Sequence, residues 1–252
     1  MRFTLDIWRQ DGPDAEGGFE RHEVHDIDGD ASFLEMLDIL NDRLITEGKR
    51  PVAFDSDCRE GICGTCSLLI DGLPHGPGQA TTCQVFMRDF PDGTEIRVEP
   101  FRNSGFPVLK DLMTDRSALD RIIQAGGFIA VGAGPKPEPN ATPIHPEVQT
   151  AAMDASICIG CGACVAACPN GSAMLFTAAK AAHLARLPQG QPERDRRARD
   201  MVAAQDAAGF GGCSTMGACT TVCPKGIDLS TIAGLNRDLL HAALSTAAKA
   251  RR

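Results

Sequence analysis

The sequence predicts an α+β chain of two parts, a strand-rich first part and an all-helical second part. Apolar and polar residues alternate in short runs before residue 100, which is typical of half-buried strands. After residue 148, apolar residues recur with helical spacing. The eleven cysteines fall into groups of regular spacing, four before residue 100 and seven after residue 150. We therefore expect one domain over residues 1–104, a connector over 105–147 and a helical domain over 148–252.

The first part is expected to begin with a hairpin followed by a helix. Residues 3–8 and 21–27 alternate as two strands around a loop rich in Gly, Asp and Pro. Ser32 and Glu35 have the spacing of a capping box, so a helix should start there and end at Gly48. Further strands are expected at residues 67–70 and 94–99.

The first cysteine group follows this helix. Four residues separate Cys58 from Cys63 and two separate Cys63 from Cys66, which is the plant-type ferredoxin spacing. Cys83 is the candidate for the distant fourth ligand, so the group predicts a [2Fe–2S] site within a β-grasp ferredoxin domain. His75 lies between Cys66 and Cys83 and could be a ligand, as in a Rieske centre. Rieske centres use two histidines, so a solvated loop histidine is the favoured interpretation.

The second part contains a run of four cysteines, Cys158, Cys161, Cys164 and Cys168, with Pro169 directly after it. Gaps of two, two and three residues are typical of bacterial ferredoxins, in which the fourth cysteine binds the other cluster. Structural zinc sites usually have paired cysteines separated by a longer loop, so zinc is disfavoured. The predicted fold here is an all-α, bacterial-ferredoxin-like domain.

A second run, Cys213, Cys219, Cys223 and Pro224, matches the same gaps with Met216 at the second position. A thioether is a weak ligand for this iron, so one corner lacks a thiolate. The crossover rule then predicts a [4Fe–4S] cluster on Cys158, Cys161, Cys164 and Cys223, and a [3Fe–4S] cluster on Cys168, Cys213 and Cys219. The alternative is a four-iron second cluster with water or a side-chain oxygen on its fourth iron. With Cys58, Cys63, Cys66 and Cys83, these sets use all eleven thiols once.

Composition narrows the function. The chain has 252 residues, a net charge of −8 and no long basic tract, so nucleic acid is not an expected partner. Residues 1–10 resemble a strand rather than a signal peptide, which favours cytosolic metal ligation over disulfides. No nucleotide-binding glycine loop, acid–base pair or nucleophile motif is present. The chain is therefore expected to carry single electrons between partners that perform the substrate chemistry.

Helical periodicity places further helices at residues 108–124, 173–187, 192–208 and 229–250, the last ending in a basic tail. Five prolines over residues 135–146 indicate an extended connector. Four arginines, Arg194, Arg196, Arg197 and Arg199, indicate a solvated helix face, or alternatively contact with anionic headgroups beside a membrane partner.

The whole chain resembles the iron–sulfur subunits of succinate dehydrogenase and fumarate reductase. Besides the cysteines, the resemblance includes the segments at residues 58–64, 107–112 and 223–226. It implies the electron-transfer subunit of an enzyme whose substrate chemistry lies on a flavoprotein partner with covalent FAD. Electrons would pass through [2Fe–2S], [4Fe–4S] and [3Fe–4S] centres to quinone and a membrane cytochrome b. The subunit would then be a peripheral protein on the cytoplasmic face of the cell membrane.

The sequence departs from ubiquinone-linked members at their quinone pocket. Those members have two tryptophans soon after the proline of the first run, where this chain has Asn170, Gly171, Ser172 and Ala173. They also have a histidine after the first cysteine of the second run, where this chain has Ser214. The first run is more similar to members with a dihaem cytochrome b that use menaquinone, so we expect quinone to bind mainly in the membrane subunit. Lys225 would add positive charge near the three-iron centre, or would simply be exposed.

Two alternatives remain at this point. One is the iron–sulfur subunit of another quinone-linked oxidoreductase, of the heterodisulfide-reductase or glycolate-oxidase kind, although those usually keep full cysteine sets. The other is a free ferredoxin-type carrier without fixed partners. The two-part chain and its long connector favour a docked subunit over a free carrier.

Overall fold

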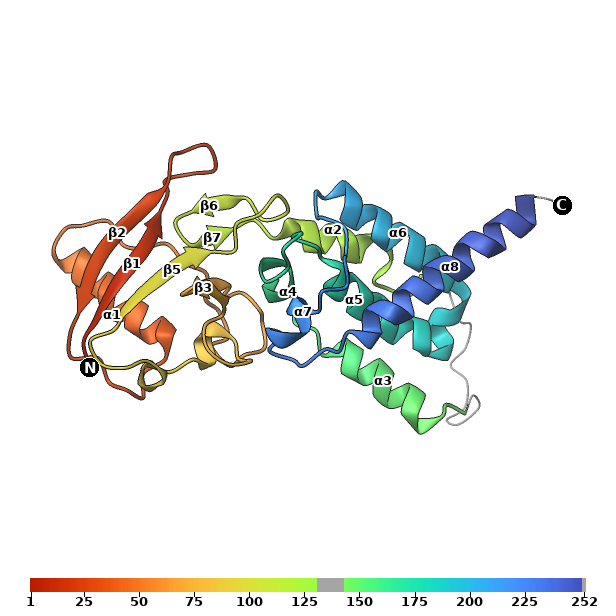
Figure 1. Cartoon of the computed structure of the whole chain (residues 1–252), viewed down its shortest axis with the longest axis horizontal. Helices are drawn as coiled ribbons and strands as arrows, with labels where there is room; N and C mark the ends of the chain where they lie inside the picture. The colour runs from red at the N-terminus through yellow and green to blue at the C-terminus, as the bar shows by residue number, and fades with distance from the viewer. Residues whose placement is uncertain (131–142, 251–252) are drawn as a thin grey trace.

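The protein consists of a sheet-containing part and a helical part lying end to end (Figure 1). The computed structural model describes residues 1–130 and 143–250, with the backbone alone for 246–250. The expected proline connector therefore falls largely outside the described residues, as do the last two residues of the basic tail. The predicted α+β class, with strands first and helices second, is confirmed.

The first part is built on a five-stranded mixed sheet in the order β2-β1-β5-β3-β4. The outer hairpin pairs β1 (Phe3–Arg9) with β2 (Gly18–Val24), and β5 (Glu95–Pro100) runs parallel to β1. The far edge is formed by β3 (Leu68–Ile70) and β4 (Leu73–Pro74). Because Gly18 pairs with Arg9, the return strand starts and ends three residues earlier than the predicted range 21–27.

The helix α1 (Phe33–Thr46) packs against this sheet. Ser32 accepts from the N–H of Glu35, and the Glu35 carboxylate accepts from the N–H of Ser32, so the predicted capping box is present. The side chains that α1 buries pack against those of β1, β3 and β5 in a single apolar core, which extends to Cys66 and Cys83. The first cysteine loop is thus attached directly to this core.

A hairpin, not a helix, follows the first part. Strands β6 (Val108–Lys110) and β7 (Met113–Thr114) flank Asp111, which has a φ of 47°, so the predicted helix over 108–124 is wrong before residue 117. The fully buried Asp111 carboxylate accepts from the N–H groups of Gln10 and Ala53 at 2.9 and 3.0 Å and pairs with Arg9 at 3.2 Å. These long-range bonds favour the left-handed turn over a helix.

The helical part forms a second apolar core. It begins with α2 (Ser117–Gly126) and continues with α3 (Pro146–Ser156), α5 (Met174–Arg186), α6 (Arg194–Ala207) and α8 (Ser230–Ala250). The two short helices α4 (Ala163–Ala166) and α7 (Ala218–Thr221) each carry one cysteine and face the sheet-containing part (Figure 1). Within the described residues, no helix is both long and apolar enough to cross a membrane.

The prediction that the four arginines of α6 form a solvated face is wrong for Arg197. Its side chain is only 1% exposed, and its three nitrogens donate to the carbonyls of Gly126, Gly190 and Phe128 at 2.8, 2.9 and 3.0 Å. It also lies 3.5 Å from the Glu193 carboxylate. Arg197 therefore joins the end of α2 to the start of α6.

Candidate metal centres

The first three cysteines of the first group lie on the loop before β3, and Cys83 follows β4 in the short 3₁₀ helix Thr82–Gln84. Backbone N–H groups surround the sulfurs of Cys58 and Cys63. The Cys58 sulfur accepts from the N–H groups of Glu60 and Cys63 at 3.4 and 3.3 Å. The Cys63 sulfur accepts from the N–H of Thr65 at 3.5 Å. Such bonds stabilise negative charge on sulfur, as a cluster loop requires.

The four thiols of this group differ in environment. Hydrogen bonds from the N–H groups of Glu60, Ile62 and Cys63 lower the pKa of Cys58 to about 7. Burial raises the pKa of Cys66 to about 12, and the neighbouring Cys83 thiol adds to this rise. Cys66 and Cys83 are therefore adjacent on the core side, and the Cys58 sulfur lies in the loop that N–H groups line.

His75 is buried rather than solvated, so that prediction is wrong. The side chain is fully buried, and Nδ1 lies 3.2 Å from the Cys66 carbonyl and 3.1 Å from Thr82 Oγ1. Burial lowers the pKa of His75 to about 4, so the ring is neutral at pH 7. Its ring packs edge-on against Phe101 with the centroids 5.4 Å apart. His75 thus supports the backbone of Cys66 through Nδ1.

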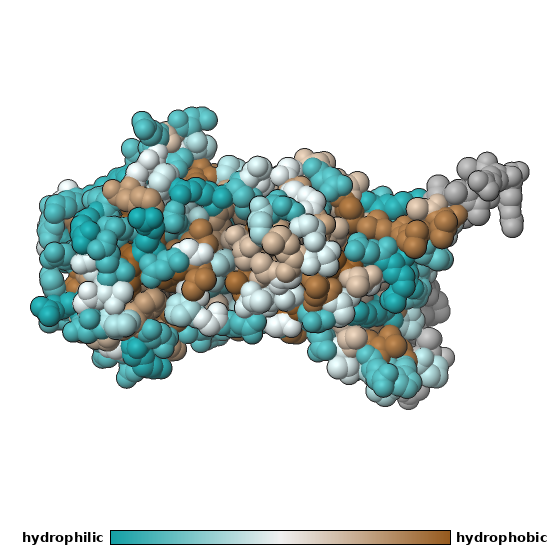
Figure 2. All heavy atoms as spheres, in the orientation of Figure 1, coloured by the Kyte–Doolittle hydropathy of each residue, from teal (hydrophilic) through white to brown (hydrophobic). Residues whose placement is uncertain are grey.

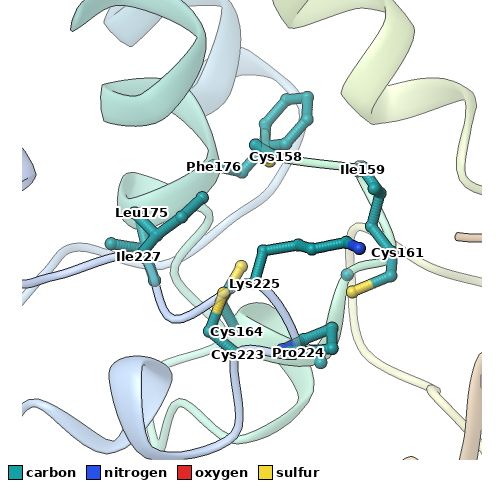
Figure 3. Close-up of a pocket in the computed structure, with 13 residues that line it drawn as sticks. Cys158, Ile159, Cys161, Cys164, Leu175, Phe176, Cys223, Pro224, Lys225 and Ile227 are labelled. Carbon is teal, nitrogen blue, oxygen red and sulfur yellow. The ribbon is translucent and has the colours of Figure 1, made fainter. Parts of the chain in front are cut away.

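The thiols predicted for the [4Fe–4S] cluster line one pocket (Figure 3). Its walls are completed by Leu175 and Phe176 at the start of α5 and by Ile227. In Figure 3 the Lys225 side chain also lies in this pocket, with its nitrogen toward Cys161. Lys225 therefore brings positive charge to the pocket of these four thiols. The four cysteines are Cys158, Cys161, Cys164 and Cys223.

Burial dominates the acidity of these thiols. It raises the pKa of Cys161 to about 12 and that of Cys164 well above its ordinary range. Negative charge on the other thiols of the pocket raises the pKa of Cys164 further. Lys180, whose Nζ donates to the Cys158 carbonyl at 2.6 Å, opposes the rise at Cys158. Four thiolates could coexist here only with compensating positive charge, which bound iron supplies.

The remaining three thiols adjoin one another around α7. Burial raises the pKa of Cys219, and negative charge on Cys168 and Cys213 raises it further. The Cys213 sulfur accepts from the N–H of Thr215 at 3.4 Å. Met216, which has the place of a missing fourth thiol, is 68% exposed. The structure thus brings together the thiols predicted for the second cluster.

The backbone repeats itself between the two runs. Gly160 and Gly162 have φ values of 65° and 85°, and Thr215 and Gly217, at the equivalent places, have 59° and 82°. Gly162 and Gly217 each precede a four-residue helix, α4 and α7. The match continues past both prolines, where Gly171 and Gly226 have φ values of 60° and 62°. This repeat places Met216 at the position of Cys161.

The donor chemistry fits clusters better than a single ion. Across residues 1–130 and 143–250, no three His, Cys, Asp or Glu side chains are arranged to hold one metal ion. Four of the cysteines line one pocket, as a cluster with its own sulfide would require. The ligand sets therefore remain a prediction that the thiol placement supports.

Three polar residues near the cysteines carry no sequence signal of their own. Lys180 contacts Cys158 from the face of α5, one turn after Phe176. Ser67 and Arg116 lie between the loops of Cys66 and Cys161. Each is an isolated residue of a common type, and only the three-dimensional arrangement identifies it.

Comparisons with known proteins agree with this architecture. A family model described as "2Fe-2S iron-sulfur cluster binding domain" matches residues 4–121, and one described as "4Fe-4S dicluster domain" matches residues 154–227. The "Succinate dehydrogenase iron-sulfur subunit" of Bacillus subtilis is 32% identical, covering 92% of this chain and 90% of the relative. The "Fumarate reductase iron-sulfur subunit" of Wolinella succinogenes is 29% identical, covering 94% and 97%.

A solved structure shares the fold. A chain of the "Mycobacterium smegmatis Sdh1 complex in the apo form" superposes with a TM-score of 0.69 at 24% identity, and the match covers 94% of each chain. Fold and thiol placement together define a two-part iron–sulfur electron-transfer protein. The chain belongs to the family of iron–sulfur subunits of succinate dehydrogenase and fumarate reductase.

Proposed function

We propose that this chain carries single electrons between a flavoprotein with covalent FAD and membrane quinone, through [2Fe–2S], [4Fe–4S] and [3Fe–4S] centres. The three clusters supply one-electron redox chemistry. The protein would hold them in the order of its parts, with the first ligand set in the sheet-containing part and the other two sets on the segments that carry α4 and α7. The ligand sets are those predicted from the spacing.

The observation that carries the proposal is the backbone repeat around Met216. Met216 has the place of Cys161 in an otherwise repeated conformation, so one corner of the second cluster lacks a thiolate. A cluster with three protein ligands loses one iron readily, which favours a three-iron centre there. The rival quinone-linked families usually keep a full cysteine set at this position.

Exposed apolar surface supports docking to partners rather than a free carrier. Figure 2 shows hydrophobic spheres along the outer part of α8, just before the grey atoms. Leu240 and Leu244, one helical turn apart on α8, are 62% and 63% exposed. Near the first cysteine group, Ile62 is 61% exposed. Apolar side chains grouped on the surface are typical of protein–protein contacts.

We assign the two ends of the chain to different partners. The sheet-containing part would face the flavoprotein, and the helical part would face a membrane cytochrome b. The quinone, which we propose is menaquinone, would bind mainly in that membrane subunit. The chain would then lie on the cytoplasmic face of the cell membrane, held there by its partners. Ser214 has the place of the histidine in the ubiquinone-linked pattern. Its uncharged hydroxyl accepts a hydrogen bond from the Asn170 side chain at 2.9 Å.

Native purification tests this function. An affinity tag on this chain, with membranes solubilised in mild detergent, should recover a flavoprotein and a membrane subunit in equal amounts. The flavin should stay on its polypeptide after denaturation, and the complex should reduce a menaquinone analogue with succinate. Recovery of this chain alone, with clusters but without a flavoprotein, would instead establish the free carrier.

A further inference from the structure

The loops that hold the first two cysteine sets touch backbone to backbone. Gly64 has a φ of 71°, and a Cβ there would lie 2.5 Å from the carbonyl oxygen of Ile159 and 3.0 Å from the Cys161 nitrogen. The buried Ser67 hydroxyl lies 2.7 Å from the Cys161 carbonyl and 3.2 Å from that of Gly64. A side chain larger than that of glycine would collide with the facing backbone, so glycine at this position allows the two loops to pack in direct backbone contact.

Arg116 reaches this contact from outside both loops. It directly precedes α2, in the segment between the two cysteine-bearing parts. One guanidinium nitrogen donates to the carbonyl of Gly64 and lies 3.4 and 3.5 Å from the carbonyls of Gly160 and Cys161. The same nitrogen is 3.3 Å from the Ser67 hydroxyl. A single cation therefore contacts carbonyls of both loops.

The surroundings of Arg116 contain ligands from both sets. A pocket of about 230 Å³ is lined by Cys63 of the first set, by Cys158 of the second set, and by the two cations Arg116 and Lys180. Asp120 is the acidic residue of its lining. Positive charge is thus placed between the first two centres, where added electrons would be stabilised.

We propose that Arg116 is a positioning residue for the transfer of one electron between the [2Fe–2S] and [4Fe–4S] centres. Its hydrogen bonds hold the loop of Gly64 against the loop of Cys161, and its charge stabilises the reduced forms of both centres. The transfer makes and breaks no bond and needs no proton. This inference rests on the proposed function, because it requires both clusters to be present.

Three variants separate the two roles in the intact complex. Arg116→Gln removes the charge and the multiple contacts, Arg116→Lys keeps the charge, and Ser67→Ala removes only an uncharged link between the loops. Arg121→Gln is the matched control, because Arg121 lies on α2 and its side chain donates to the Ser117 hydroxyl of the same helix at 2.9 Å. The readouts are the midpoint potentials of both centres, followed by EPR during redox titration, and amide hydrogen exchange over residues 64–67 and 159–161.

Arg116→Gln should shift both potentials to more negative values and speed exchange in both loops by roughly tenfold, as loss of a charged hydrogen bond predicts. Arg116→Lys should keep both potentials near those of the parent and still speed exchange. Ser67→Ala should speed exchange without shifting the potentials, and Arg121→Gln should change neither quantity.

Unchanged potentials and unchanged exchange in Arg116→Gln would overturn the inference. If that variant fails to assemble, Arg116→Lys decides: parent-like exchange in the lysine variant contradicts the positioning role, and faster exchange with parent-like potentials supports it. The parent complex distinguishes this failure from failure of the proposed function, because a parent without the two cluster signals would refute the function itself.

Discussion

Gly64→Ala is the sharpest test of the contact between the first two cysteine loops. The left-handed backbone at Gly64 makes any side chain cost about 1–2 kcal/mol. The new Cβ would also lie 2.5 Å from the Ile159 carbonyl, where ordinary contacts begin near 3.4 Å. The two loops must therefore separate by nearly an ångström, and overpacking of this kind costs about 1–3 kcal/mol.

Gly72→Ala provides the matched control. Gly72 lies in the turn between β3 and β4 with a φ of 77°, and its added Cβ would meet nothing within 4 Å. It therefore has the conformational cost without the clash. We expect losses of roughly 2–5 kcal/mol for Gly64→Ala and about 1–2 kcal/mol for Gly72→Ala. A difference of about 2 kcal/mol corresponds to about 4–8 °C in Tm for a chain of this size.

The assay is thermal unfolding of the cluster-loaded protein, followed by circular dichroism. Because loss of clusters makes unfolding irreversible, parent and variants are compared at one scan rate. Gly64→Ala should melt several degrees below Gly72→Ala. Equal Tm values for the two variants would refute the close approach of the Gly64 and Ile159 backbones.

Three further substitutions test other parts of the structure. Met216→Cys should supply the missing thiolate, abolish the three-iron EPR signal, add one iron and slow electron delivery to quinone. The control Met216→Leu should keep the three-iron signal. A persistent three-iron signal in the cysteine variant would refute the overlay of the two cysteine runs. Arg197→Met leaves three carbonyls without their donor and should lower the free energy of unfolding, measured with denaturant, by about 3–5 kcal/mol. The same change at the exposed Arg196 should lower it by less than about 1 kcal/mol. Asp111→Asn should cost about 1–3 kcal/mol, because the buried Arg9 keeps Glu20 but loses its second carboxylate, and the new amide NH₂ replaces an oxygen that accepts from a backbone N–H. A parent-like unfolding midpoint would contradict the ion-pair geometry.

Features set by neighbouring residues could be predicted from the sequence. The capping box of Ser32 and Glu35 depends on four consecutive residues, and the structure contains both of its bonds. The spacing of the thiols predicts how they divide into sets, and the four thiols predicted for the [4Fe–4S] cluster line one pocket. The equivalence of Met216 and Cys161 also had a sequence signal, because Gly162 and Gly171 recur as Gly217 and Gly226 at the same offsets.

Features set by distant residues could not be predicted. The arginine pattern on α6 is the same whether the face is solvated or packed. Two of the carbonyls that accept from the buried Arg197, those of Gly126 and Phe128, lie about 70 residues away in the sequence. Asp111 turns the chain because Gln10 and Ala53 donate to its carboxylate. His75 is buried because its ring packs against Phe101 and its Nδ1 lies beside the Cys66 carbonyl. Each outcome depends on which parts of the chain meet, which local periodicity does not record.

The most direct test of the central claim is low-temperature EPR of the air-oxidised complex, with iron counted on the same sample. An oxidised [3Fe–4S] centre is paramagnetic, whereas oxidised [2Fe–2S] and [4Fe–4S] centres are silent. The proposed ligand sets predict a signal without reductant and about nine irons per chain. A sample that is silent until reduced, with about ten irons per chain, would contain a four-iron second cluster and would contradict the assignment.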